Sequence, residues 1–180
     1  MLRCVVPVRA AVKGIVIILV AFLAGGCVSP REIRKEFEPY SICPGDRYHL
    51  FVATEDTTWK HDVVDHLAED LGDQYCLSVQ NLAALGTASV GQWDAVVVLT
   101  TIYAFGLQSD TAGFLERAEQ KERIVLLVTS SISDLKEYGV DAVSAASTGN
   151  VGEDARSLTP RRQPDDVAAE LARLVRLRVE

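Results

Sequence analysis

Two nearly uninterrupted apolar runs constrain the fold of this chain more than any other feature. They are WDAVVVLTT (Trp93–Thr101) and RIVLLVTSS (Arg123–Ser131). A strand with one face in water alternates apolar and polar residues, and these runs do not, so we predict strands that are buried on both faces. We predict a helix between them at Ser109–Gln120, capped by Ser109 or Asp110. Strands of this kind joined through a helix indicate a parallel sheet covered by helices on both sides.

The flanking segments continue the alternation of strand and helix. We expect further strands at residues 48–54, 75–82 and 140–147, and further helices within residues 55–72 and at 164–180. Gly72 suits the C-terminus of the first helix, and Pro164 stands near the start of the last one. Only eight residues, 132–139, separate the fourth strand from the fifth. This is fewer than a helical crossover usually needs, so we predict a shortened fourth crossover.

The order and lengths of these elements predict an α/β domain at residues 48–180 with a doubly wound, mostly parallel five-stranded sheet. The stretch LFVATEDTTWKHDVVDHLAEDLG resembles the first strand, phosphate loop and first helix of flavodoxins. The stretch WDAVVVLTTIYAFGLQSDTAGFLER resembles their third strand, flavin-side loop and third helix. The resemblance implies an FMN site at the carboxyl ends of the strands. The residues that it implies for that site are Thr54, Thr57, Thr58, Thr101 and Tyr103.

The phosphate loop departs from the flavodoxin pattern. The family's loop runs Thr-x-Thr-Gly-x-Thr, whereas residues 54–59 read TEDTTW and contain no glycine. Glu55 and Asp56 would each repel a phosphate charge by about 3 kcal/mol at about 5 Å and an effective dielectric near 20. Asp56 has an alternative role as the cap of the first helix. We therefore predict weak or absent FMN binding, and a membrane-anchored FMN-dependent redox protein is the alternative.

The N-terminus has the layout of a cleaved export signal. Arg3, Arg9 and Lys13 precede thirteen uncharged residues, 14–26, and this run is too short to span a bilayer comfortably. The run ends in LAGGC, which resembles the lipobox of bacterial lipoproteins. The resemblance implies cleavage before Cys27, a lipidated Cys27, and a membrane-anchored protein at the outer membrane or on the periplasmic face of the inner membrane. An uncleaved signal anchor and a buried apolar segment are the alternatives.

The charge of the processed chain excludes one class of partner. The predicted signal peptide, residues 1–26, carries three basic residues and no acid, so the net charge of −7 becomes −10 for residues 27–180. An acidic surface disfavours polyanions, and we predict no nucleic-acid binding. Residues 27–47 contain three prolines and no sustained period, which is typical of a tether, here a lipidated one.

Two cysteines remain after processing, because the cut removes Cys4 and lipid consumes Cys27. Cys43 lies five residues before the first predicted strand, and Cys76 lies at the start of the second. These strands are parallel neighbours in a flavodoxin-like order, so both thiols should lie at one edge of the sheet. Disulfides persist outside the cytoplasm, and we predict a Cys43–Cys76 bond, with two unpaired thiols as the alternative.

No motif points to catalysis. His61 with Asp65 and Asp62 with His66 form i,i+4 pairs of a spacing that can hold a metal, but both lie opposite the apolar face of their helix, which favours an ordinary solvated face. We predict no metal site, and we lean against an enzyme. The sequence favours an exported, lipid-anchored cell-envelope protein whose flavodoxin-like domain is a non-catalytic binding or interaction module, with a protein partner in the envelope.

Overall fold

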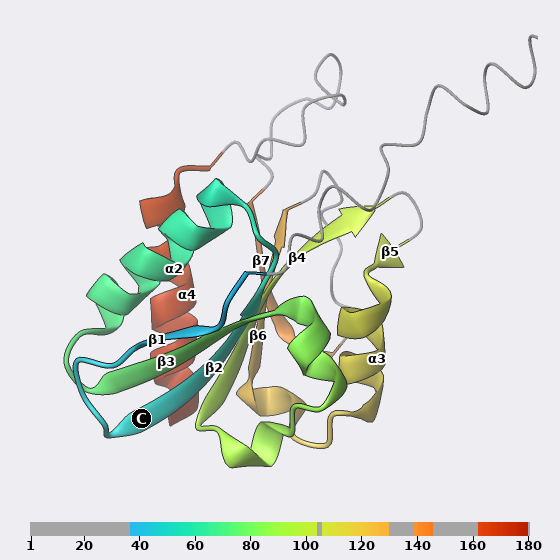
Figure 1. The fold of residues 1–180 in the computed structure, drawn as a ribbon, viewed down its shortest axis with the longest axis horizontal. Coiled ribbons are helices and arrows are strands. Elements are labelled where there is room, and N and C mark those ends of the chain that lie inside the picture. Colours follow the sequence, from blue (N-terminus) through green and yellow to red (C-terminus); the bar gives the residue numbers. More distant parts are fainter. Residues whose placement is uncertain (1–36, 104–105, 130–138, 146–161, 180) are drawn as a thin grey trace, which may run out of the picture. The chain divides into compact units, whose positions relative to one another are not determined.

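The structure is a computed structural model, and it describes residues 37–103, 106–129, 139–145 and 162–179 (Figure 1). The strands are β1 (Tyr40–Ile42), β2 (Tyr48–Thr54), β3 (Tyr75–Asn81), β4 (Ala95–Tyr103), β5 (Gly106–Leu107), β6 (Ile124–Thr129) and β7 (Asp141–Ser144). The helices are α2 (Thr58–Leu71), α3 (Ser109–Arg117) and α4 (Pro164–Val179), and the 3-10 turns are η2 (Leu82–Gly86), η3 (Val90–Gln92) and η4 (Lys121–Arg123). No helix in these ranges has the length and apolar character needed to cross a membrane.

The order of the strands confirms the predicted fold class. The strands lie side by side as β1-β3-β2-β4-β6-β7, and β5 pairs with the end of β4. The last five strands of this order, β3, β2, β4, β6 and β7, run parallel to one another. Numbered along the chain, the parallel strands have the order 2-1-3-4-5, which is the flavodoxin-like doubly wound arrangement. The short antiparallel strands β1 and β5 bring the sheet to seven strands within the described residues, whereas we predicted five.

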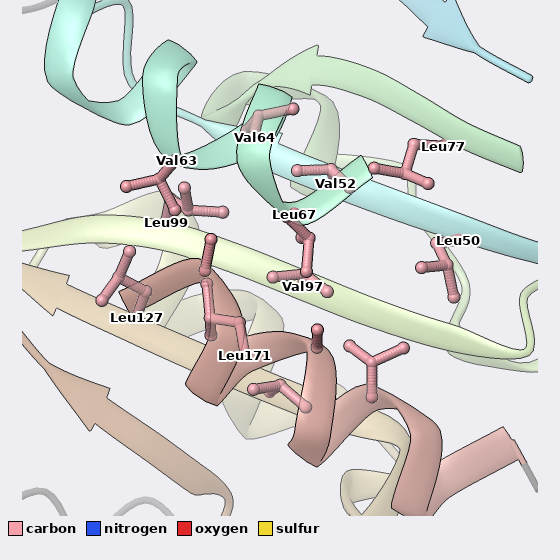
Figure 2. Close-up of a cluster of buried hydrophobic side chains, with 14 of the residues drawn as sticks. Leu50, Val52, Val63, Val64, Leu67, Leu77, Val97, Leu99, Leu127 and Leu171 are labelled. Atoms are coloured by element: carbon pink, nitrogen blue, oxygen red, sulfur yellow. The ribbon is translucent and has the colours of Figure 1, made fainter. Parts of the chain in front are cut away.

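Strict alternation along the buried strands divides the core into two layers. Leu50 and Val52 of β2 face the layer that contains α2 and α4, and Figure 2 shows them with Leu67 and Leu171 from these helices. The intervening Phe51 packs in the opposite layer, where α3, η2 and η3 cover the sheet. The side chains of β4 and β6 divide between the layers in the same way. Both faces of the central strands are therefore apolar, as the uninterrupted runs in the sequence predicted.

The domain begins earlier than we predicted. We assigned residues 27–47 to a tether, but Tyr40–Ile42 form β1, which pairs antiparallel with β3. A Cβ atom at Gly45 would lie 1.7 Å from the carbonyl oxygen of Asp73, so glycine is needed where the β1–β2 connection passes the α2–β3 turn. A strand of three residues is too short to show a period in the sequence, and the prolines around it are typical of a linker.

A disulfide fixes this additional strand to the sheet. Ile42 pairs with Leu77, and the next residues along the two strands, Cys43 and Cys76, are bonded to each other with their Cα atoms 4.0 Å apart. They are the two cysteines for which we predicted a bond. The route of the bond differs from our prediction. We expected Cys43 to lie on the chain that enters β2, whereas it follows β1, which pairs antiparallel with β3. The bond encloses β2 and α2 in a loop with a sequence separation of 33.

Candidate ligand-binding edge of the sheet

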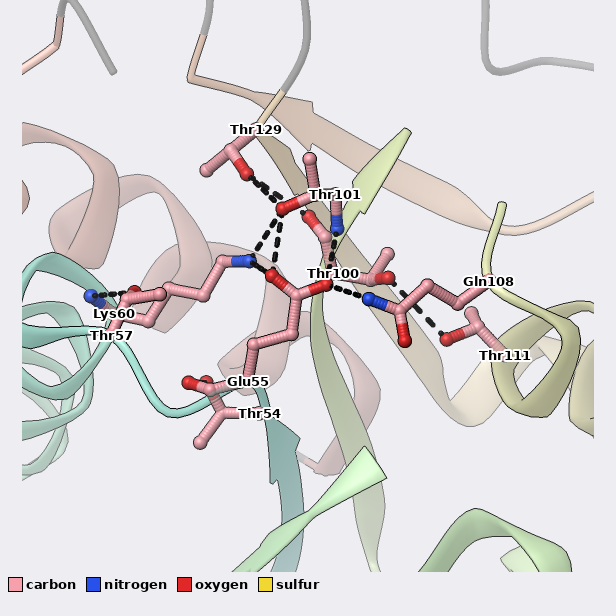
Figure 3. A network of polar contacts seen from close by, with 9 residues as sticks. All are labelled: Thr54, Glu55, Thr57, Lys60, Thr100, Thr101, Gln108, Thr111 and Thr129. Atoms are coloured by element: carbon pink, nitrogen blue, oxygen red, sulfur yellow. Dashed lines mark hydrogen bonds and ion pairs between the residues drawn. The ribbon is translucent and has the colours of Figure 1, made fainter. Parts of the chain in front are cut away.

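A network of buried polar side chains lies at the carboxyl ends of β2, β4 and β6 (Figure 3). In an open doubly wound sheet this is the edge at which ligands bind, next to the point where the strand order reverses. The network is centred on Glu55, which directly follows β2, and on Lys60 from the first turn of α2. Their side chains are 3% and 2% exposed, so both charges are removed from water.

The Glu55 carboxylate accepts four hydrogen bonds from three residues. Its Oε1 atom accepts from the backbone N–H of Thr101 at 3.2 Å and from the Gln108 side-chain amide. Its Oε2 atom accepts from the Lys60 ammonium and from the Thr101 hydroxyl, the latter at 2.7 Å. A carboxylate has about four lone-pair positions, so these donors saturate it. The structure therefore provides a complete set of partners for a buried negative charge.

Two hydroxyls, of Thr101 and Thr129, extend the network behind this carboxylate. Thr101 Oγ1 gives its proton to Glu55 and accepts from Lys60 Nζ at 2.9 Å. It also lies 2.8 Å from Thr129 Oγ1 at the end of β6, and the Thr129 hydroxyl has a second acceptor in the carbonyl oxygen of Thr100 at 3.4 Å. The network thus connects β4, β6, α2 and the residue preceding α3. Together these elements hold the Glu55 carboxylate in position.

We did not identify Lys60 from the sequence, although a signal for it exists. It lies three and four residues before Val63 and Val64, on the stripe of α2 that faces the sheet. A lysine on an apolar stripe requires a buried partner, and Glu55 lies five residues upstream. Burial lowers the pKa of the Lys60 ammonium from its usual value, and the Glu55 charge and hydrogen bond oppose that shift. Gln108 and Thr129 gave no sequence signal, since they come from distant parts of the chain.

Two of the three predicted phosphate-loop residues make hydrogen bonds within the chain. Thr57 is the N-cap of α2, and its Oγ1 accepts from the backbone N–H of Lys60 at 3.3 Å. Our assignment of the cap to Asp56 was therefore wrong by one residue. Thr54 is buried and donates to the carbonyl oxygen of Glu55, whereas Thr58 is exposed at the start of α2.

Of the two predicted flavin-side residues, Thr101 and Tyr103, the structure describes the side chain of Thr101. Thr101 is buried in the network, as described above. Tyr103 is the last residue of β4, where its backbone pairs with Gly106, and its side chain lies outside the described residues. Cys27 also lies outside them.

A second polar cluster lies where the lead-in chain meets α2. His61 is 3.2 Å from Asp56 Oδ1 through Nε2 and 3.1 Å from the Tyr40 hydroxyl through Nδ1, so Tyr40 donates to the ring if Nε2 carries the proton. The Phe37 ring meets the His61 ring edge-on with centroids 4.9 Å apart. Burial raises the pKa of Tyr40, and the charge of Asp65 adds to the shift. His61 thus holds β1 against α2, which is a structural role.

The other histidine of the candidate pairs contacts a different carboxylate from the one we considered. His66 Nδ1 lies 3.4 Å from Glu69 Oε2, on the outer face of α2. Across the ranges that the structure describes, no three His, Cys, Asp or Glu side chains gather in a way that could hold a metal ion.

Several donors of residues 54–60 are already engaged with other groups of the chain. The Thr57 hydroxyl and the Lys60 backbone N–H are engaged with each other in the helix cap, and the Thr57 N–H donates to the carbonyl oxygen of Glu55 at 3.0 Å. The Lys60 ammonium, the one cation in the network, is paired with Glu55. A phosphate of about −1.5 to −2 charge would have to displace this carboxylate or lie beside it.

The comparisons with known proteins do not define a family for this chain. No protein-family model and no curated protein matches the chain. Among solved structures, an oxidoreductase from Corynebacterium diphtheriae matches at 12% identity and a TM-score of 0.44, covering 73% of this chain and 99% of that one. A WrbA-like flavodoxin from Agrobacterium tumefaciens matches at 13% and 0.44, covering 73% and 97%. A Streptococcus pneumoniae flavodoxin matches at 13% and 0.43, covering 72% and 97%.

Proposed function

We propose that this protein is an exported, lipid-anchored component of the cell envelope whose flavodoxin-like domain is a non-catalytic binding or interaction module. The observation that carries the proposal is the saturated Glu55–Lys60 network at the ligand edge of the sheet. A redox flavoprotein of this fold needs that edge to receive a phosphate and a flavin. Here the donors at that edge bind a carboxylate of the chain itself.

The location in the envelope is supported by two independent features. The sequence has a basic segment, a short apolar segment and then LAGGC, which is the order of a lipoprotein signal. The bond between Cys43 and Cys76 suits a compartment outside the reducing cytoplasm. A diacylated or triacylated Cys27 would hold the protein stably on the membrane, because several acyl chains bind far more firmly than one.

The proposed partner is a protein of the envelope. The net charge of −10 for residues 27–180 works against nucleic acid and against close approach to anionic headgroups. The domain itself would therefore not bind the lipid surface, and we propose that its binding partner is a protein.

Titration with FMN tests the non-redox part of the proposal. The full-length lipidated protein, held in detergent micelles with its disulfide intact, is titrated against FMN while flavin fluorescence is followed. We expect no quenching at about 10 μM, which corresponds to a binding free energy weaker than about −7 kcal/mol. Stoichiometric quenching at or below that concentration would overturn the proposal and favour the alternative, a membrane-anchored FMN redox protein. In that case Asp56→Gly should strengthen binding and Tyr103→Ala should weaken it.

A further inference from the structure

We propose that the donors around Glu55 form a carboxylate-binding site whose resident ligand is the Glu55 side chain itself. Four hydrogen bonds converge on one carboxylate from Lys60, Thr101 and Gln108, which belong to α2, β4 and the N-cap of α3. The donors are distributed as two for each oxygen. This inference rests on the proposed function, in which a carboxylate of the chain itself occupies the ligand edge. It names the kind of ligand for which the donors at that edge are arranged.

The geometry favours a carboxylate over a phosphate as the occupant. Two oxygens with two donors each match a planar anion with two equivalent oxygens. A phosphate has a third free oxygen, which the described donors leave without a partner, and its charge of about −1.5 to −2 exceeds the single positive charge of Lys60. The site is thus built for one negative charge.

The position of Gln108 shows how one of the four donors is supplied to the site. It stands at the N-cap of α3, where a side chain commonly bonds to the first turn of its own helix. Gln108 makes no such bond, and its amide donates to Glu55 instead. Thr129 Oγ1 lies 2.8 Å behind Thr101 Oγ1 and ties the site to β6.

Glu55 excludes free carboxylates because it is covalently part of the chain. A tethered ligand competes at an effective concentration that is commonly millimolar or higher, and here the backbone on both sides is held by β2 and α2. The unsubstituted protein should therefore show no affinity for small carboxylates. Removal of the side chain should expose the donors to a ligand from solution.

Acetate is the sharpest probe of this idea. Glu55→Ala keeps Cβ and deletes a CH₂ group with its carboxylate, and acetate replaces those heavy atoms one for one. Formate lacks a carbon and leaves a gap, whereas propionate has one carbon too many for the space. The expected order of binding to Glu55→Ala is therefore acetate, then formate and propionate, with phosphate weakest.

The experiment measures thermal unfolding and NMR line broadening on the full-length protein in detergent. For Glu55→Ala, about 100 mM sodium acetate should raise Tm by about 5 °C over equal sodium chloride, as expected for a Kd of a few millimolar. The ¹³C line of [1-¹³C]acetate should broaden with this variant. Neither effect should appear in the unsubstituted protein or in Glu69→Ala, which removes an exposed carboxylate from the outer face of α2.

Each other outcome has a defined meaning. Equal Tm values in acetate and chloride, or a larger shift with phosphate than with acetate, would overturn the carboxylate site. If Glu55→Ala does not fold in chloride, acetate should restore its native circular dichroism on refolding from urea, and a failure to do so would also overturn the site. The Glu55→Ala/Lys60→Met variant removes the cation and should lose the response to acetate. Failure of the acetate test leaves the FMN result standing, so the two proposals are tested separately.

Discussion

Replacement of Lys60 by methionine should show how much the buried pair contributes to the stability of the domain. Methionine fills nearly the same volume but leaves the Glu55 carboxylate, 3% exposed, without its counter-ion. At a separation of about 3 Å and an effective dielectric near 20, the lost attraction is about 5–6 kcal/mol. Thr101 and Gln108 continue to donate to the carboxylate and offset part of this loss. We expect a net cost of about 3–4 kcal/mol, within the usual range for one partner of a buried pair.

The assay is urea unfolding at pH 7, followed by circular dichroism. For a domain of this size the m value is about 2 kcal/mol/M, so the midpoint should fall by about 1.5–2 M urea. Glu55→Gln should also destabilise, because it leaves the Lys60 charge buried. The Glu55→Gln/Lys60→Met variant should recover most of the loss, with a coupling free energy of about 2–4 kcal/mol. Glu69→Gln, which breaks an exposed pair with His66, is the matched control and should change stability by less than about 0.5 kcal/mol.

The same variants give a pH dependence with a defined sign. Burial lowers the pKa of Lys60 in the folded protein below its usual value of 10.5. Between these two pKa values the unfolded chain binds more protons at Lys60 than the native protein does. The unfolding free energy should therefore rise with pH across that window, relative to Glu55→Gln/Lys60→Met, and should level off above about pH 10.5.

A Lys60→Met cost below about 1 kcal/mol, or strict additivity of the two single variants, would refute the reasoning at pH 7.

Two further predictions concern the Cys43–Cys76 disulfide and the lipid anchor at Cys27. Cys43→Ser/Cys76→Ser should lose about 3–4 kcal/mol of unfolding free energy by the chain-entropy estimate for a loop of 33 residues. Two reactive thiols in the unsubstituted protein, when it is denatured without reduction, would show instead that the bond is absent. Cys27→Ser should abolish labelling by a fatty-acid probe and leave unprocessed precursor in the membrane, and labelling that persists in this variant would rule out Cys27 as the lipid site.

The sequence was informative where burial imposes a period. The runs at β4 and β6 predicted strands buried on both faces, and the apolar stripe of α2 with Gly72 at its end predicted the helix and its C-cap. The strand at residues 140–147 is present as β7, parallel to β6. These elements are specified by local patterns that the hydrophobic effect makes visible in a single sequence.

The features that the sequence did not reveal depend on contacts between distant residues. β1 has three residues, and its place is set by β3 and by the disulfide, so no local pattern marks it. Glu55 looked like a carboxylate that would repel a ligand, because its partners lie 46 and 53 positions further along the chain. Lys60 is the exception, since its position on the buried stripe of α2 could have been noticed.

The buried carboxylate also has a physical reason that is independent of any ligand. Where a doubly wound sheet ends, strand-end N–H groups and the first turns of helices leave donors that need an acceptor. In nucleotide-binding proteins of this fold a phosphate accepts from such groups. Here the Glu55 carboxylate accepts from the backbone N–H of Thr101 near the end of β4 and from three side-chain donors. Stability and ligand binding therefore compete for the same donors. A variant that gains an anion from solution at this edge must first lose the stabilisation that Glu55 provides, so selection for stability alone would keep the site closed.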